Sequence, residues 1–423
     1  MPSYRMYWSD ACRFSPIADV MPRNRFGKLR NVVHLNDNSN MIMKQHPQYD
    51  PLFKVRPFLT LVQENLKAIP VEENHSIDEM IIPFKSRSFL KQYNKNKPHK
   101  WGMKVFVRAG ASGMAYDFEV YIGKGTTKTN EKSSLGISGD IVVRLVQNLP
   151  SDQNIKIYFD NWFASYDLVS TLKEMGFWSV GTVRSNRIPG CQLEEDKTLK
   201  KERGSFDYRT EAKKNVSVVK WFDNKCVHLI SSFIGCTPVE NVRRWSVAKR
   251  QYIQVPQPAA VKTYNKHMGG VDLHDMLIEL YRIDFRSKRY YLRIFFQIVD
   301  MCVINAWLLY RRHCEQQEVN HKPQLTFRSE VAHTLLQAGK SLKRKRGRPS
   351  MESTGDNPQR RRISQKPVDD VRLGGIAHWP QHVEEKQRCK FCIKAYSRTQ
   401  CEKCGLALCL TKERNCFKDF HTT

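Results

Sequence analysis

The pattern of hydrophobic and polar positions changes along the chain, and the changes predict its main elements. Residues 1–74 are predicted to be mostly helical. From Ile77 to about Val183 the pattern is that of strands, because runs such as Met103–Arg108 and Asp117–Ile122 alternate or are rich in β-forming residues, with glycine-containing turns between them. This part of the chain is therefore predicted to form a sheet.

One predicted strand leads directly into an aspartate. Apolar positions alternate through Ile155–Phe159 into Asp160, so Asp160 is predicted to stand at the end of that strand. Helix is predicted to follow over residues 168–175.

A more polar stretch then interrupts the pattern. Residues 187–258 have Pro-Gly and Pro-x-Pro sequences at their ends, which is typical of an inserted subdomain. Helix is predicted to resume around Gly270 and to run to about Arg312. The longest apolar stretch, Tyr290–Tyr310, contains four polar side chains, which favours a buried helix over a membrane span. These four are Arg293, Gln297, Asp300 and Asn305.

The net charge of the chain indicates a binding partner. The chain carries 70 Lys and Arg residues against 42 Asp and Glu, a formal net charge of +28. Such an excess repels itself without a polyanionic partner, and nucleic acid is the first candidate, with a merely soluble basic surface as the alternative. The sequence starts without an apolar signal segment, so we expect no secretory route and no membrane, and we expect the cysteines to be reduced.

Half of the twelve cysteines fall near the C-terminus, in two C-x-x-C pairs and two further positions. Paired thiolates at this spacing are typical of zinc sites, whereas disulfides are disfavoured for reduced cysteines. The predicted ligands are Cys389, Cys392, Cys401, Cys404, Cys409, Cys416 and His421. Two tetrahedral sites need an eighth ligand, for which His378 is the candidate and His382 the alternative. Spacing alone leaves open which ligands share an ion.

The segment before this module is basic and poor in apolar residues, so residues 339–377 are predicted to be a disordered linker. Lys343–Pro349 is a candidate nuclear localisation signal, bipartite with Arg360–Arg362. Its Arg346 and Arg348 also fit an AT-hook, in which arginines lie in a narrow minor groove. A solvated linker without either role is the alternative.

Four aspartates form a candidate metal site. Asp78 lies in a strand-forming run and Asp160 ends a strand, while Asp272 and Asp275 share one face if their segment is helical. Phosphodiester cleavage with two Mg²⁺ ions needs such a cluster of hard oxygen ligands. Each aspartate taken alone is more often a helix cap, a turn residue or a surface charge.

Basic residues follow two of these aspartates, with Tyr93 and Trp101 interleaved in the first group. Such groups are placed to contact phosphates, and an ordinary charged surface is the alternative. The first group is Lys85, Arg87, Lys91, Lys95, Lys97 and Lys100, and the second is Arg282, Arg286, Lys288, Arg289 and Arg293.

Five segments stand in an order that resembles the piggyBac family of transposases, and most closely its vertebrate members. They are Ser76–Met80, Lys97–Lys104, Asp160–Ser165, Gly181–Asn186 and Gly269–Asp275. The resemblance covers essentially the whole chain, and five ordered motifs make coincidence a poor explanation.

The resemblance implies an α/β RNase H-like catalytic core with an inserted subdomain, flanked by a mainly helical dimerisation and DNA-binding domain. In this chain the core would be residues 75–186 and 259–281, the insertion 187–258, and the helical domain 1–74 together with 282–338. A small cysteine-rich domain, 378–423, would hold two Zn²⁺ in a cross-brace-like arrangement.

The resemblance also implies a catalytic triad of Asp78, Asp160 and Asp272, with Asp275 as a fourth carboxylate, holding Mg²⁺ or Mn²⁺. Family chemistry is excision at TTAA through a hairpin and strand transfer into double-stranded DNA, which implies a nuclear homodimer bound to transposon ends. The family usually has a longer segment before the first aspartate. We therefore expect a domesticated DNA-binding protein that retains the site, with an active cut-and-paste transposase as the alternative and a zinc-finger chromatin adaptor without catalysis as the third.

Overall fold

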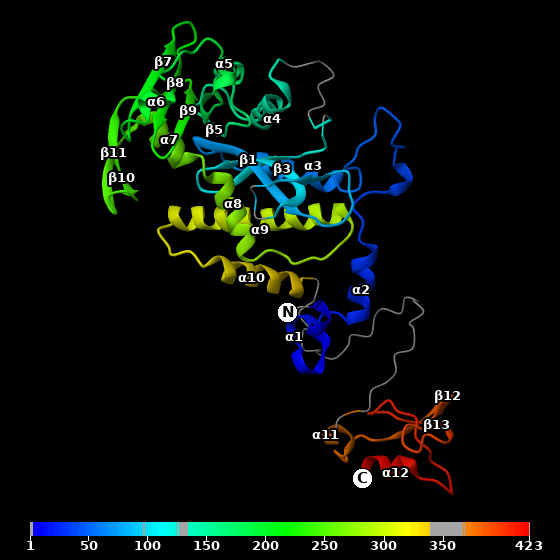
Figure 1. Ribbon diagram of the computed structural model, residues 1–423. Helices are drawn as coiled ribbons and strands as arrows, with labels where there is room; N and C mark the ends of the chain where they lie inside the picture. The colour runs from blue at the N-terminus through cyan, green and yellow to red at the C-terminus, as the bar shows by residue number, and fades with distance from the viewer. Residues whose placement is uncertain are drawn as a thin grey trace. The chain divides into compact units, whose positions relative to one another are not determined.

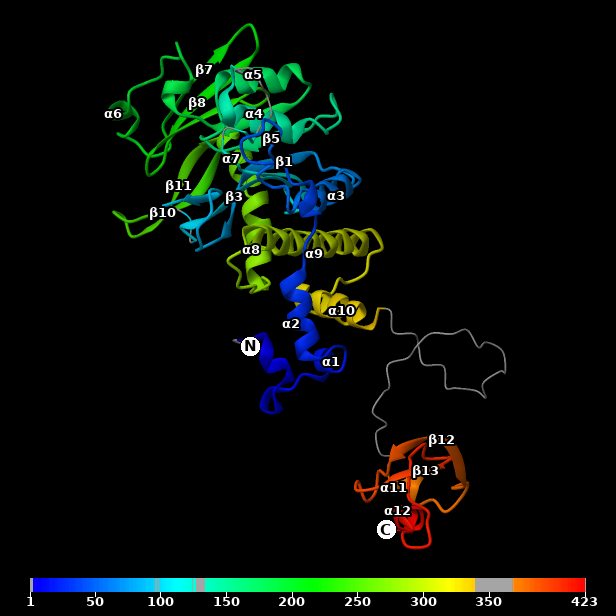
Figure 2. The same ribbon diagram turned by 90° about the vertical axis from the view of Figure 1, so that its right-hand side faces the viewer.

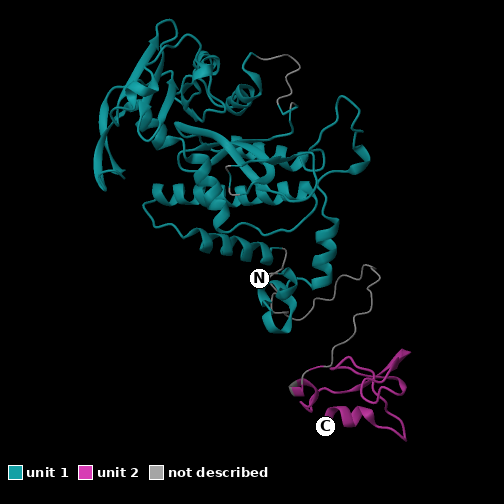
Figure 3. Ribbon diagram, viewed as in Figure 1, with its two compact units in different colours: residues 1–340 teal, residues 341–423 magenta. Residues whose placement is uncertain are grey.

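The computed structural model describes residues 3–95, 97, 99–123, 125–126, 134–338, 367 and 369–422. Contacts divide the chain into two compact units, residues 1–340 and 341–423 (Figure 3). Each unit has its own buried apolar core and is described by itself.

The first unit is built on one mixed sheet. Its strands are β1 (Asn74–Pro83), β2 (Lys91–Tyr93), β3 (Trp101–Gly110), β4 (Ala115–Val120), β5 (Lys156–Phe159), β6 (Trp178–Thr182), β7 (Phe206–Glu211), β8 (Val216–Phe222) and β9 (Cys226–Ser231). The strand order is β2-β3-β1-β5-β6-β9-β8-β7, with β4 also paired to β3. β1, β5 and β6 are mutually parallel, and the other pairs are antiparallel. Two further strands, β10 (Val239–Ser246) and β11 (Gln251–Pro258), pair only with each other.

The helices of this unit are α1 (Ser15–Ala18), α2 (Arg23–Val32), α3 (Arg56–Lys67), α4 (Gly136–Val146), α5 (Tyr166–Glu174), α6 (Asp196–Leu199), α7 (Ala259–His267), α8 (Gly270–Leu280), α9 (Tyr290–Gln316) and α10 (Gln324–Gln337). Short 3-10 helices cover Tyr4–Trp8, Asp10–Cys12, Asn38–Asn40 and Ser185–Arg187.

Helices cover both faces of the sheet (Figure 1). On one face, Ile77 and Phe159 pack with residues of α4 and α5. On the other, Met80 and Ile82 pack with α3, α8 and α9. Because side chains alternate along a strand, residues of β1 point alternately into these two cores.

Helix α9 is long and apolar enough to cross a membrane, but 56% of its most apolar window is buried inside the protein. Its interrupting polar residues bond to neighbouring elements. Asn305 bonds to the backbone N and O of Ala115 at 3.0 and 2.7 Å, and Arg293 donates to Pro83 O. α9 is thus a core helix of this unit, as its polar interruptions predicted.

Several predicted elements are found where the periodicity placed them, and others differ. Helix α5 corresponds to the helix predicted over 168–175, and Asp160 directly follows β5. Helix resumes earlier than predicted, at Ala259, because Pro258 ends β11 and fits the start of a helix. The prediction of one helix to about Arg312 is wrong, since residues 281–289 between α8 and α9 are not helical. Within 187–258, strands β7–β9 extend the main sheet through the β6–β9 pair, so the boundaries of an inserted subdomain stay a prediction.

The second unit contains α11 (Asp369–Arg372), β12 (Pro380–Arg388), β13 (Tyr396–Cys401) and α12 (Cys416–Thr422). Arg372 Nη1 donates to Phe420 O at 2.7 Å. Helix α11 therefore packs with this unit, although it falls within the predicted linker. The predicted signal Lys343–Pro349, with Arg346 and Arg348, lies outside the described residues.

Candidate functional sites

Asp78 and Asp160 lie side by side where two parallel strands stop pairing. β1 and β5 pair from Asn74–Lys156 to Ile77–Phe159, and the two aspartates are the next residues on each strand. Paired strands lie about 4.8 Å apart, so the two side chains start from adjacent backbone positions. Both alternate with residues that face α4 and α5, so both are on the sheet face that α7 and α8 cover.

The first turn of α8, which contains Asp272, packs against β1 close to Asp78. Val271 N donates to Ser76 Oγ at 3.1 Å, and Ser76 precedes Asp78 by two residues on the same strand face. A Cβ on Gly270 would lie 2.3 Å from Gly110 O and 2.7 Å from Ser76 Oγ, so the helix can approach this closely only with glycine there. Asp272, whose side chain is exposed, therefore lies on a helix that packs directly on β1.

Burial and nearby negative charges raise the pKa of three carboxyl groups, those of Asp78, Asp160 and Asp275. Burial, followed by the charges of Glu79 and Asp160, raises the pKa of Asp78 to about 8. Burial is also the main cause of the raised pKa of Asp160 and of Asp275. A bound divalent cation reverses this effect, because it stabilises the ionised form.

Asp275 and Lys97 complete the surroundings. Asp275 lies on the same face of α8 as Asp272, and its Oδ1 is buried with no hydrogen-bond partner among the described residues. Lys97 Nζ donates to Glu79 O at 3.2 Å. The positive charge of Lys97 offsets part of the rise in the pKa of Asp78 and of Asp275. An unpartnered buried carboxylate oxygen is a suitable position for a cation ligand.

Tyr264 of α7 lies near these aspartates, and no motif in the sequence points to it. Burial, followed by the charges of Asp160, Asp78 and Asp272, raises the pKa of its hydroxyl to about 12. All three aspartates thus act on one hydroxyl group. Tyr264 belongs to no recognised motif, so only the packing of α7 against the sheet reveals its position.

The four aspartates of the first unit do not form a compact set of metal ligands. Within the described residues, groups of three or more ligand atoms within 4.8 Å of one another occur only in the second unit. Two ions about 4 Å apart, each about 2.1 Å from its ligands, can be held by carboxylates up to about 8 Å apart.

Most of the basic residues predicted to contact DNA are exposed. This group is Lys85, Arg87, Lys95, Lys100, Arg286, Lys288 and Arg289, whereas Lys97 is half-buried beside the carboxylates. The interleaved aromatics pack together, because the Tyr93 and Trp101 rings are 4.8 Å apart and Lys91 lies over Trp101. Arg282 pairs with Glu279 at 2.6 Å, so it stabilises the end of α8 instead of facing solvent.

The C-terminal unit gathers all eight predicted zinc ligands into two groups of four, His378 included and His382 not. One group is Cys389, Cys392, Cys409 and Cys416, and the other is His378, Cys401, Cys404 and His421. Membership alternates along the chain, which is a cross-brace arrangement. Ile393 and Gly405, the residues after each C-x-x-C pair, both have positive φ, 59° and 68°. Each pair therefore ends in the same tight turn.

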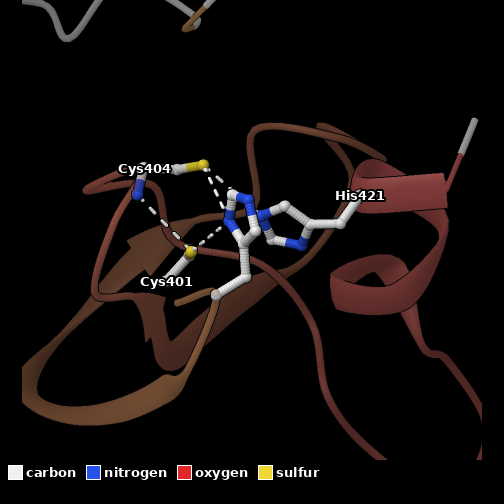
Figure 4. Close-up of side chains that lie close together, drawn as sticks. Cys401, Cys404 and His421 are labelled. Carbon is white, nitrogen blue, oxygen red and sulfur yellow. Dashed lines mark hydrogen bonds between the residues drawn. The ribbon is translucent and has the colours of Figure 1, made fainter. Parts of the chain in front are cut away.

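Distances in both groups match tetrahedral zinc. Zn–S bonds of about 2.3 Å place sulfur atoms about 3.8 Å apart, and a sulfur about 3.5 Å from a nitrogen ligand. Cys392 Sγ and Cys409 Sγ are 3.9 Å apart. Cys404 Sγ lies 3.4 Å from His421 Nε2 and 3.5 Å from His378 Nδ1. Figure 4 shows the side chains of Cys401, Cys404 and His421 close together.

Outer contacts orient the ligands. His421 Nδ1 donates to Phe417 O at 2.7 Å, which leaves Nε2 as the unprotonated nitrogen that faces the cysteines. Burial and Cys401 raise the pKa of Cys404 to about 11, and burial with Cys389 and Cys392 raises that of Cys409 to about 12. Thiols this crowded ionise together only around a cation.

Comparison with known proteins decides the family. A family model described as Transposase IS4 matches residues 1–307. The human piggyBac transposable element-derived protein 3 is 32% identical over 428 aligned positions, which cover 100% of this chain and 67% of that protein. The chain belongs to the piggyBac transposase family. Human piggyBac transposable element-derived protein 2 is 30% identical, over 99% of this chain and 67% of its own length.

A solved piggyBac structure shares the fold. The chain is similar to the piggyBac transposase in a synaptic complex with hairpin DNA, with a TM-score of 0.65 and 20% sequence identity. The match covers 95% of this chain and 80% of that one. The mixed sheet with helices on both faces is therefore a piggyBac fold in this chain.

Proposed function

We propose that this chain is a piggyBac-derived nuclear DNA-binding protein that retains a DDD site for TTAA-directed cleavage and strand transfer. The observations that support it best are the register of β1 and β5, which puts Asp78 and Asp160 on adjacent strands, and the Ser76–Val271 hydrogen bond, which docks the helix that carries Asp272 on β1. The strand order β4-β3-β1-β5-β6, with helices between the parallel strands, supports an RNase H-like core.

Each residue has a role in this proposal. Mg²⁺ or Mn²⁺ at the site would activate the attacking hydroxyl and stabilise the leaving oxygen of the phosphodiester. Asp78, Asp160 and Asp272 would hold the ions, and Asp275 would supply its buried oxygen as a further ligand. Lys97 would offset part of the negative charge before the ions bind.

The partner would be double-stranded DNA. The net charge of +28 and the exposed basic residues around the aspartates favour it, since phosphate contacts supply most non-specific affinity. The two cysteine and histidine groups would hold two Zn²⁺ in a module that helps to recognise transposon ends. Dimerisation, and nuclear import through Lys343–Pro349, belong to the same proposal.

A nicking assay tests the proposal. Supercoiled plasmid with TTAA sites is incubated with the full chain and Mn²⁺, and nicked products are sequenced. We expect nicks at TTAA, and we expect Asp160→Asn to lower their rate at least about 100-fold while DNA binding persists, because several kcal/mol of metal stabilisation are lost. Asp167→Asn, an exposed carboxylate on α5, is the matched control and leaves the rate unchanged.

The same assay distinguishes an active transposase from a domesticated DNA-binding protein. The complete set of aspartates favours it, and integration of a donor duplex into TTAA would establish it. DNA binding without nicks would leave a domesticated binder, and absence of both would contradict the proposal. A zinc adaptor without catalysis leaves the convergence of the aspartates unexplained.

A further inference from the structure

The β10–β11 ribbon pairs with no strand of the main sheet (Figure 2). Its two faces carry different side chains. Its inner face packs against the rest of the first unit. Val242, Ile253 and Val255 pack in a core with Trp221, and Trp221 Nε1 donates to Pro256 O at 2.8 Å. Arg244 pairs with Asp223 at 3.1 Å. The ribbon is therefore held in one orientation.

The outer face is exposed and carries side chains that can read bases. Its central residues are Asn241, Arg243 and Trp245 on β10, and Tyr252 and Gln254 on β11. Antiparallel register places Arg243 opposite Gln254 and Trp245 opposite Tyr252, so they form one patch. Trp245 and Tyr252 remain 49% and 56% exposed, although such aromatics are usually buried.

The basic side chains of the outer face and its turn have no acidic partner among the described residues. Arg243 lies 3.9 Å over the Tyr252 ring, and it makes no ion pair within the described residues, nor do Lys249 and Arg250 in the turn that joins the strands. On the inner face, by contrast, Arg244 and Arg203 both pair with Asp223. The one nearby acid on β10, Glu240, pairs with Lys262 and alternates with the outer residues.

We propose that the outer face of this ribbon lies in the major groove of duplex DNA and reads base edges there. The inference rests on the proposed function, because it names the surface that would select the DNA. A two-stranded ribbon fits the major groove, where arginine pairs with guanine and asparagine or glutamine with adenine. Lys249 and Arg250 contact the flanking phosphates, which fix the register of the ribbon on the duplex.

Nucleic acid fits this face better than a protein strand does. A protein strand added to a sheet bonds to the backbone of its edge, whereas the exposed groups here are side chains on the face. The face has no carboxylate, and its donors and acceptors match base edges. A protein interface remains as one outcome of the test.

Cross-linking locates the contact directly. The full chain carries p-benzoylphenylalanine at Trp245, or as control at the exposed Tyr208 of β7, and is irradiated with labelled random-sequence duplexes. We expect DNA adducts from position 245 and none from position 208. A chain that binds the duplexes but gives no adduct at 245 overturns the ribbon inference and leaves the proposed function intact, and so does an adduct to protein.

Affinity measurements separate phosphate contacts from base contacts. Lys249→Ala with Arg250→Ala should make the negative slope of log K against log salt shallower by about 2, whereas Lys225→Ala, in the β8–β9 turn, should leave the slope unchanged. Arg243→Lys should keep the slope but lose at least about five-fold in preference for duplexes enriched by the wild type. Unchanged slope and preference contradict the ribbon inference, and a wild type that binds no duplex contradicts the proposed function itself.

Discussion

At the scale of residues, the fold depends on a histidine that stays uncharged. His75 of β1 is fully buried between Arg108 of β3 and Tyr116 of β4, and Arg108 Nη1 donates to its Nδ1 at 3.3 Å. Burial, followed by the charge of Arg108, lowers the pKa of His75 to about 3. The unfolded chain binds this proton near pH 6.5, so the unfolded state takes up more protons between these values.

Stability should therefore fall as the pH falls from 7. At pH 5 the depressed pKa of His75 costs about 2 kcal/mol of unfolding free energy, because the unfolded imidazole is protonated and the folded one is not. Denaturant unfolding of the full chain at pH 5 to 7.5 measures this slope. His75→Gln should flatten the slope relative to the wild type, and parallel curves for the two proteins would contradict the account.

At the scale of elements, the seating of α8 on β1 fixes the candidate site. The N-terminus of α8 has no side-chain cap of its own, and Ser76 of β1 supplies the hydrogen bond to Val271 N. His274 Nδ1 bonds to Gly113 O at 2.8 Å and holds the same helix one turn further on. Asp272 lies between these two contacts, so its position follows from the docking of the helix.

Gly270→Ala should disturb this docking. The added Cβ would meet the backbone of Gly110, which cannot move aside cheaply, and overpacking of this kind costs about 1–3 kcal/mol. Nicking should fall more than about ten-fold as Asp272 is displaced. Gly269→Ala is the matched control, since nothing lies within 4 Å of its added Cβ. Equal rates for the two variants would show that the seating of α8 does not position Asp272.

The periodicity of apolar and polar residues explains which parts of the fold and of the candidate site could be predicted from the sequence. Asp160 at a strand end, and Asp272 with Asp275 on one helix face, follow from periodicity within a few residues. The pairing of β1 with β5, the place of Tyr264 and the continuation of the sheet into β7–β9 depend on contacts between distant segments, which periodicity does not encode. The zinc ligands could be named from spacing, but their partition needed the fold.

At the scale of the whole molecule, the chain consists of two units with separate means of stabilisation. The first has an extensive apolar core around its sheet, whereas the core of the second consists mainly of the ligand cysteines and a few apolar side chains. A unit this small rarely folds on its apolar core alone. Its stability should therefore depend on zinc, which contributes about 10–16 kcal/mol in small structural sites.

Chelation should accordingly unfold one unit and spare the other. We expect about two Zn²⁺ per chain by metal analysis, since two groups of four ligands are present. After chelation, proteolysis should degrade the C-terminal unit and leave residues 1–338 protected. Cys401→Ser should lower the zinc content to about one, and Cys191→Ser, in the first unit, should not change it. A metal-free C-terminal unit that resists protease would contradict this account.

Iron-directed cleavage of the polypeptide tests most directly whether the three aspartates share one metal site. Fe²⁺ bound in place of Mg²⁺, with ascorbate and peroxide, cuts the backbone near its ligands. We predict cuts next to Asp78, Asp160 and Asp272 together, suppressed by excess Mg²⁺ and lost in Asp160→Asn but not in Asp167→Asn. Cuts at one aspartate alone, or a pattern that Asp160→Asn leaves unchanged, would contradict the shared site.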